Sequence, residues 1–215
     1  MTGDHINKYL FNEELPILFE AGRIAMPLFT LVLAYNLARP NANASGAYSR
    51  MTTRLALFGL ISSVPFVGLE ILFWGWYPLN IFFTLLVVTL VVRLVEQARS
   101  RGSILVGLGA LAAFVVGGGL VEFWWPAVTI GLGAWLYFKS GNLLGLGASM
   151  ASCASLWYIN GNFWALAAYP LLILLSRINV QAPRLRWFFY GYYPAHLLAI
   201  YLIRIPMARA GYEFY

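Results

Sequence analysis

Asp4 and His5 stand side by side near the beginning of a very apolar sequence, within the stretch MTGDHINKYL. A carboxylate and an imidazole are the smallest set of groups that can form an oriented general base. Neighbouring residues on a helix point about 100° apart, so Asp4 is not expected to hold His5 directly. We expect Asp4 to pair with Arg23 instead, which leaves His5 free to take a proton.

More polar residues interrupt the apolar segments further along the chain. Arg23 follows Glu20 by three residues and shares a helix face with it, so these two side chains could simply neutralise each other. Asn80 opens the segment NIFFTL, either as a helix cap or as a group that stabilises charge. Near the end of the chain, Tyr193 and His196 lie three residues apart. A single histidine within a membrane is as often satisfied by a nearby hydroxyl as used in chemistry, but the whole set favours a shared pocket.

The composition places these residues in a membrane. The 215 residues are 61% hydrophobic and 10% charged, and the mean hydropathy is +0.73, whereas soluble domains contain roughly 45–50% apolar residues. A net charge of +6 would suggest nucleic acid as a partner of a soluble protein, but in membrane proteins basic residues collect in cytoplasmic loops. We therefore expect a lipid bilayer and no nucleic acid as partner. The single cysteine, Cys153, provides neither a disulfide framework nor a metal site.

Apolar runs of sufficient length predict how the chain crosses the bilayer, since a spanning helix needs about 20 mostly apolar residues. The sequence predicts an all-α fold, a polytopic transmembrane helical bundle of about eight spans that forms a single domain over residues 1–215. The predicted spans are residues 16–38, 55–74, 79–95, 103–121, 124–138, 143–159, 163–176 and 187–205.

Basic residues alternate between the connections and so predict the orientation. Ten of the 14 Lys and Arg residues follow the first, third, fifth or seventh span, and the intervening connections are aromatic instead. The positive-inside rule makes the basic side cytoplasmic. Asp4 and His5 then lie at the outer face, where we expect a further apolar helix ahead of residue 4 to bring the polypeptide from the cytoplasm. The alternative is a polar tail that starts at Met1. The ten basic residues are Arg39, Arg50, Arg54, Arg93, Arg99, Arg101, Lys139, Arg177, Arg184 and Arg186.

Five segments resemble, in order and in spacing, the motifs of the TraX family. They are DHINKYL, GRIAMPLF at 22–29, ISSVPF at 61–66, NIFFTL at 80–85 and FYGYYPAHLLAIYLIR at 189–204. The resemblance covers nearly the whole chain, and its first, second and last motifs are specific. It implies a multi-pass protein of the bacterial inner membrane that acts as an acetyltransferase with acetyl-CoA as donor, since the namesake of the family acetylates the pilin of conjugative plasmids. Position by position it implies functional roles for Asp4, His5, Gly22, Arg23, Pro27, Phe29, Asn80, Tyr193, Pro194 and His196.

The expected catalytic residues are therefore Asp4, His5, Arg23, Asn80, Tyr193 and His196. One of the two histidines would deprotonate an amine or hydroxyl acceptor, either pilin or another envelope component, and Arg23 or Asn80 would stabilise charge on the acyl oxygen. The phosphates of acetyl-CoA would be attracted by Arg54, Arg99, Arg184 and Arg186, although membrane topology alone also explains these arginines.

The motifs that the sequence does not contain narrow the chemistry. It shows no nucleophile elbow, no phosphate-binding glycine loop and no dinucleotide fingerprint. Direct transfer assisted by a histidine base is therefore favoured over a covalent intermediate. Two alternatives remain from the residues alone: a transporter whose buried ionisable groups relay protons or bind a substrate, and a non-enzymatic pilus or envelope assembly factor.

Overall fold

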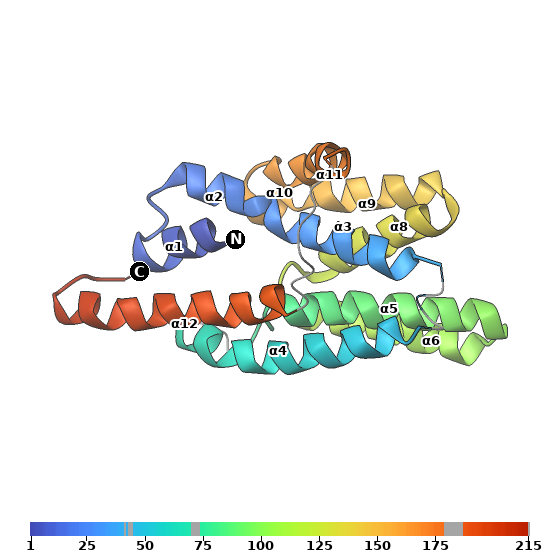
Figure 1. Cartoon of the computed structure of the whole chain (residues 1–215), viewed down its shortest axis with the longest axis horizontal. Helices are drawn as coiled ribbons and strands as arrows, with labels where there is room; N and C mark the ends of the chain where they lie inside the picture. Colours follow the sequence, from blue (N-terminus) through green and yellow to red (C-terminus); the bar gives the residue numbers. More distant parts are fainter. Residues whose placement is uncertain (41, 43–44, 70–73, 179–186, 215) are drawn as a thin grey trace.

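The computed structural model describes residues 1–40, 42, 45–69, 74–178 and 187–214, which are mostly helical (Figure 1). Within these residues the only β-structure is an isolated bridge between Leu79 and Val121, so the predicted all-α fold is confirmed. The helices are α1 (Thr2–Leu10), α2 (Pro16–Arg23), α3 (Ala25–Ala38), α4 (Ala47–Leu69), α5 (Ile81–Arg101), α6 (Ile104–Ala112), a π-helical turn (Ala113–Gly117), α7 (Gly118–Leu120), α8 (Trp124–Ser140), α9 (Leu143–Ser155), α10 (Trp157–Asn160), a 3-10 turn (Trp164–Ala167), α11 (Ala168–Ser176) and α12 (Phe188–Arg209).

In the described part of the chain, three helical segments are long and apolar enough to cross a bilayer. They are Pro16–Ala38, Ala47–Leu69 and Ile81–Arg101, and two shorter apolar segments are Ile104–Leu120 and Trp164–Ser176. Every predicted span overlaps with helical structure. The structure is therefore compatible with a helical membrane bundle, and the count of about eight crossings stays a prediction.

The helix boundaries differ from the predicted spans where charge or backbone geometry intervenes. α4 begins at Ala47 rather than at residue 55, because Arg50 and Arg54 end an apolar run but not a helix. The predicted span 16–38 is divided at Ile24, where α2 ends and α3 begins. Both changes lie close to residues of the candidate site, and the division at Ile24 places Arg23 at the end of its own short helix.

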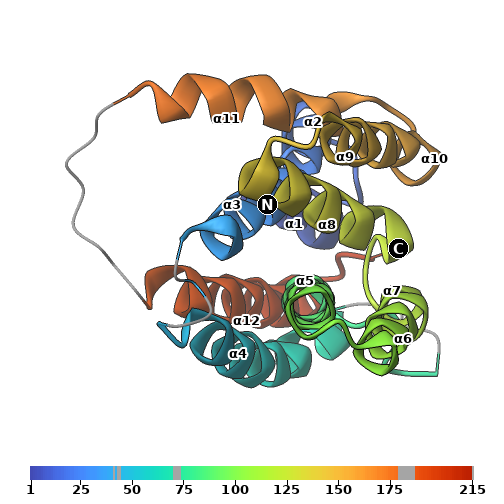
Figure 2. The same cartoon turned by 90° about the vertical axis from the view of Figure 1, so that its right-hand side faces the viewer.

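The helices pack in two layers (Figure 2). One layer contains α3, α8 and α9 with α11 on its outer side, and the other contains α12, α4, α5 and α6. The buried core between the layers includes Leu37, Val88, Ile130 and Trp135. Dispersion and close packing of such side chains hold helices together in a bilayer, where the hydrophobic effect between spans is weak.

The short helix α1 lies at one end of the bundle, in contact with α2 and α12 (Figure 1). Its turn into α2 is fixed by Asn7, whose side-chain oxygen accepts a hydrogen bond from the backbone N–H of Leu15 at 2.7 Å. Pro16 then opens α2, a position where its fixed φ angle favours a helix start. The C-terminal segment returns to the same end, where the side chain of Asn12 donates to the backbone oxygen of Glu213 at 3.0 Å.

Candidate active site

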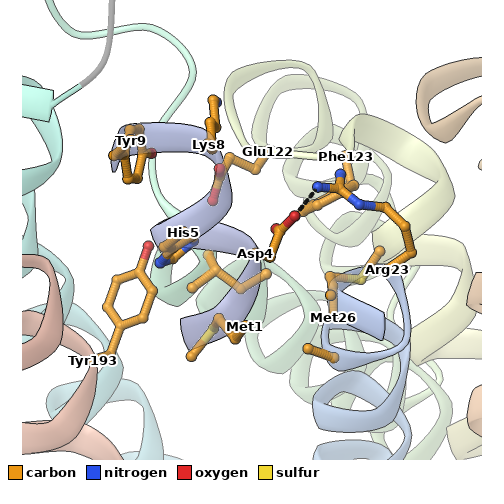
Figure 3. Close-up of a pocket in the computed structure, with 13 residues that line it drawn as sticks. Met1, Asp4, His5, Lys8, Tyr9, Arg23, Met26, Glu122, Phe123 and Tyr193 are labelled. Carbon is orange, nitrogen blue, oxygen red and sulfur yellow. Dashed lines mark hydrogen bonds and ion pairs between the residues drawn. The ribbon is translucent and has the colours of Figure 1, made fainter. Parts of the chain in front are cut away.

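A small polar cavity of about 90 Å³ lies where α1, α2, α5 and α12 meet (Figure 3). Four of the six expected catalytic residues line it, and they come from three helices that are far apart in the sequence. The lining residues are Met1, Asp4, His5, Lys8, Tyr9, Gly22, Arg23, Ala25, Met26, Ile81, Glu122, Phe123 and Tyr193.

An ion pair between Asp4 and Arg23 forms one wall of this polar cavity (Figure 3). The Nη2 group of Arg23 donates to the Asp4 carboxylate, so the acidic partner of Arg23 is Asp4 and not Glu20. Nε of Arg23 donates to the backbone oxygen of Phe19 at 3.3 Å, and the guanidinium lies 4.1 Å above the Phe19 ring. These contacts fix the cation with its face covered by an aromatic ring.

Gly22 permits the close approach of α1 and α2 that the ion pair requires. A Cβ atom at this position would collide with the side chain of Asp4. Small residues allow two backbones to approach closely in membrane helices. The glycine therefore acts through Asp4, and any larger residue must displace the carboxylate from Arg23.

The two histidines of the chain bind each other. Nδ1 of His5 lies 2.8 Å from Nε2 of His196, and Nδ1 of His196 lies 2.9 Å from the backbone oxygen of Tyr192. A carbonyl only accepts, so Nδ1 of His196 must donate, and in a neutral ring Nε2 of His196 is then the acceptor. His5 therefore donates through Nδ1, and its own Nε2 is left without a proton.

His5 lines the polar cavity and His196 does not. His196 fixes the tautomer of His5 through their hydrogen bond. In many enzymes a carboxylate does this for a histidine. Tyr193 packs edge-on against both rings, with centroid distances of 6.0 Å to His5 and 5.4 Å to His196. Of the two histidines, His5 is therefore the one at the cavity, and His196 is hydrogen-bonded to it from behind.

Asn80 lies outside this group, with a hydrogen-bonding arrangement of its own. Its oxygen caps α5 by accepting from the N–H of Phe82 at 3.1 Å, and Nδ2 donates to the backbone oxygen of Gly59 at 2.9 Å and to Oγ of Ser63 at 3.1 Å. The side chain is only 1% exposed. Both amide hydrogens are used, so the structure supports the helix-cap reading of Asn80 and leaves no donor for a substrate.

A family model described as TraX protein matches residues 1–204 of the chain. The chain belongs to the TraX family. Comparisons with curated proteins and with solved structures give no match. The expected family is thus confirmed, and with three long apolar helices the chain is a TraX-family membrane protein.

Two of the four arginines expected to bind acetyl-CoA in this TraX protein, Arg54 and Arg99, lie away from the polar cavity. The guanidinium of Arg54 lies 4.5 Å above the ring of Trp187, at the beginning of α12, and Arg99 is exposed in the last turn of α5. Arg184 and Arg186 lie outside the described residues, as does Glu70. A phosphate-binding role for these arginines stays a prediction.

A second, larger cavity of about 440 Å³ adjoins the polar one in this TraX protein. It is almost entirely apolar, lies between α3, α4, α5 and α12, and shares Met1, Ile81 and Tyr193 with the polar cavity. Asn36 and Met51 line its far part, near the end of α3 and the beginning of α4. Its lining residues are Met1, Leu28, Phe29, Val32, Leu33, Asn36, Met51, Leu55, Ile81, Phe82, Leu85, Phe189, Tyr190 and Tyr193.

Three polar residues of the site were missed by sequence reasoning. Lys8 lies one helical turn after Asp4 on α1, so its position on the same helix face could have been noticed. Glu122 belongs to the connection before α8, and Asn160 ends α10 and accepts from Nη1 of Arg23 at 3.5 Å. No motif or helical spacing in the sequence points to Glu122 or Asn160. Among the described residues, no group of three or more His, Cys, Asp or Glu side chains could hold a metal ion.

Proposed function

We propose that this TraX-family protein is an acetyltransferase of the bacterial inner membrane that transfers the acetyl group of acetyl-CoA to an amine or hydroxyl acceptor. The amino terminus of a pilin subunit is the acceptor to test first, because of the family to which the chain belongs. One observation carries the proposal: the hydrogen bonds from His5 through His196 to Tyr192 leave an imidazole nitrogen without a proton beside a cavity that also contains Arg23.

The proposed reaction is a direct transfer. Nε2 of His5 takes a proton from the acceptor amine while the amine nitrogen attacks the thioester carbonyl carbon. Negative charge develops on the acyl oxygen, and N–H groups of Arg23 stabilise it. The C–S bond then breaks, and the proton on His5 passes to the leaving thiolate of coenzyme A. His5 ends the cycle in the form in which it began.

The sizes of the two cavities support a model in which each cavity holds a different part of the substrates. A space of about 90 Å³ holds the reacting groups only. The larger cavity shares three residues with it and extends toward the side on which Arg39 and Arg50 lie, the side that we expect to be cytoplasmic. We propose that the donor enters from that side, with Arg54, Arg99, Arg184 and Arg186 attracting its phosphates.

The test uses membranes that contain the full chain, radiolabelled acetyl-CoA and a pilin acceptor. We expect the wild-type protein to label the acceptor and His5→Ala to lower the rate about 10²- to 10⁴-fold, the usual contribution of a general base. His196→Ala should also abolish most of the transfer, because His5 then loses the acceptor that fixes its tautomer. The control is Lys139→Met, whose side chain lies away from both cavities.

Full transfer in both histidine variants, at equal amounts of protein in the membrane, would contradict the proposed base. If membranes that contain the wild-type protein, radiolabelled acetyl-CoA and the pilin acceptor give no labelled acceptor, the chain is an assembly factor or a transporter instead. In a proton-coupled transporter the same histidine variants would lose substrate uptake without any labelled product.

A further inference from the structure

Arg23 holds its partners in a way that is unusual for an arginine beside a carboxylate. Arginine and carboxylate groups frequently form two parallel N–H bonds, because the planar fork of the guanidinium matches the two carboxylate oxygens. Within the part of the chain that the structure describes, Arg23 reaches Asp4 through Nη2 alone. Its Nε donates to Phe19, and Nη1 donates to Oδ1 of Asn160 at 3.5 Å.

Asn160 reaches Arg23 from a distant part of the chain. It is the last residue of α10 and only 5% exposed. The backbone around it is fixed, because its N–H donates to the oxygen of Leu156 at 2.8 Å and Gly161 ends the helix with a φ of 69°. That positive φ favours glycine and turns the chain directly after Asn160. The asparagine is therefore a rigid acceptor supplied from 137 residues further along the sequence.

The number of N–H groups that Arg23 uses shows what Asn160 contributes. A guanidinium has five N–H groups. Three of those of Arg23 are used, by Asp4, Phe19 and Asn160. Two have no partner among the residues that the structure describes, one on each terminal nitrogen, next to the cavity that His5 also lines. Without Asn160, the acceptor that the guanidinium already contacts is Asp4, so Nη1 can rotate onto the second carboxylate oxygen and complete the two-bond geometry that arginine and carboxylate groups frequently form.

We propose that Asn160 is a positioning residue of the site. By accepting from Nη1 it keeps the guanidinium from closing on Asp4 with two bonds, and so keeps two N–H groups available for the acyl oxygen. The consequence for the reaction rests on the proposed acetyl transfer. The effect of Asn160 on the hydrogen bonds of Arg23 does not depend on that activity, so the two effects can be measured separately.

The kinetic test compares Asn160→Leu with Asn160→Asp in the full chain. Removing one hydrogen bond to a charged group corresponds to about a 10- to 100-fold change, so we expect kcat of Asn160→Leu to fall by that factor with KM nearly unchanged. Asn160→Asp keeps an oxygen acceptor and should restore most of kcat. The matched control is Asn162→Leu, because Asn162 lies two residues further on, accepts only from the N–H of Trp164 at 3.2 Å and lines neither cavity.

A second readout does not need activity. In ¹⁵N-arginine spectra of the purified full chain, the Arg23 side-chain signals are those lost in Arg23→Lys. We expect Asn160→Leu to shift the Arg23 Nη signals and both Asn160→Asp and Asn162→Leu to leave them close to their wild-type positions. Unchanged Arg23 signals in Asn160→Leu would overturn the proposal, whether or not kcat falls. A wild-type protein without transferase activity would overturn the proposed function instead, and the spectra would still decide the role of Asn160.

Discussion

The ion pair of Arg23 with Asp4 and that of Lys139 with Glu96 each join two helices in the described part of the chain, and they differ in what surrounds them. Arg23 and Asp4 connect α2 to α1, with side chains 14% and 15% exposed, in the wall of the polar cavity. Lys139 and Glu96 connect α8 to α5 at 2.7 Å, with side chains 37% and 20% exposed, at the end of the bundle that carries the basic residues. His5 lies beside the first pair in the wall of the polar cavity, whereas both histidines of the chain lie away from the second.

The cost of breaking an ion pair depends on how well solvent reaches it. An exposed ion pair contributes about 0–1 kcal/mol to stability, because water solvates either partner when the other is removed. The Arg23–Asp4 pair is partly buried, so a charge left alone there is solvated less well, and breaking the pair costs between the value for an exposed pair and the about 3–5 kcal/mol of a fully buried one. The structure therefore predicts that substitutions near the Arg23–Asp4 pair lower stability more than a substitution at Lys139 does.

The largest effect is expected at Arg23. Arg23→Leu leaves the Asp4 carboxylate without its cation, and it also removes the donors proposed for the acyl oxygen. We expect stability to fall by more than the about 0–1 kcal/mol of an exposed pair and by at most the about 3–5 kcal/mol of a fully buried one, and transfer to fall by about 10²- to 10³-fold. Thermal unfolding in detergent and the radiolabel assay measure the two losses separately. If Arg23→Leu is no less stable than Lys139→Met, the distinction between the two ion pairs is wrong.

A smaller effect is expected at Gly22, where an added methyl group meets Asp4. Gly22→Ala should lower stability by about 1–3 kcal/mol, the usual cost of overpacking, and should reduce transfer because Asp4 moves away from Arg23. The control is Gly147→Ala on α9, where an added Cβ has nothing within 4 Å. That control should be neutral or slightly stabilising, because alanine favours a helix more than glycine does.

Asn80 tests whether a buried polar group outside the cavity matters for chemistry. Asn80→Ala removes the cap of α5 and leaves the N–H of Phe82 without an acceptor. A lost cap costs about 0.5–2 kcal/mol, so we expect a lower unfolding temperature but an unchanged turnover per folded molecule. A large loss of turnover at normal stability would instead restore Asn80 to the catalytic group.

The smallest effect is expected at the exposed pair. Lys139→Met should change stability by about 0–1 kcal/mol and leave transfer unaffected. Raising the salt concentration should reduce the difference between wild type and Lys139→Met further, because salt screens exposed charges. A stability loss in this variant equal to that of Arg23→Leu would show that both ends of the bundle are equally shielded from solvent.

The sequence predicted the helices and part of the site for identifiable reasons. Apolar runs locate helices that face lipid, which is why every predicted span overlaps with a helix. A carboxylate partner for Arg23 was predictable because few charged side chains lie in the apolar segments, but the sequence left Glu20 and Asp4 both open, and the structure shows Asp4. The start of α4 was not, because Arg50 and Arg54 interrupt hydropathy without interrupting the helix.

The remaining part of the site depends on packing that no local pattern encodes. His5 and His196 are 191 residues apart, and which ring nitrogen is left free follows only from the bond between His196 and Tyr192. Asn160 is one polar residue at the end of the short helix α10, and it meets Arg23 only because α2 packs against the 3-10 turn that follows α10. Long-range geometry of this kind requires coordinates.

The apolar cavity beside the site has a practical consequence for purification. An apolar hollow of this size excludes water and accepts hydrocarbon. A detergent with a slender alkyl tail can therefore enter it and reach Tyr193, whose ring packs against both histidines. Extraction with bulky steroid-based detergents, or into lipid nanodiscs, should preserve turnover better than extraction with linear ones, even when both yield folded protein.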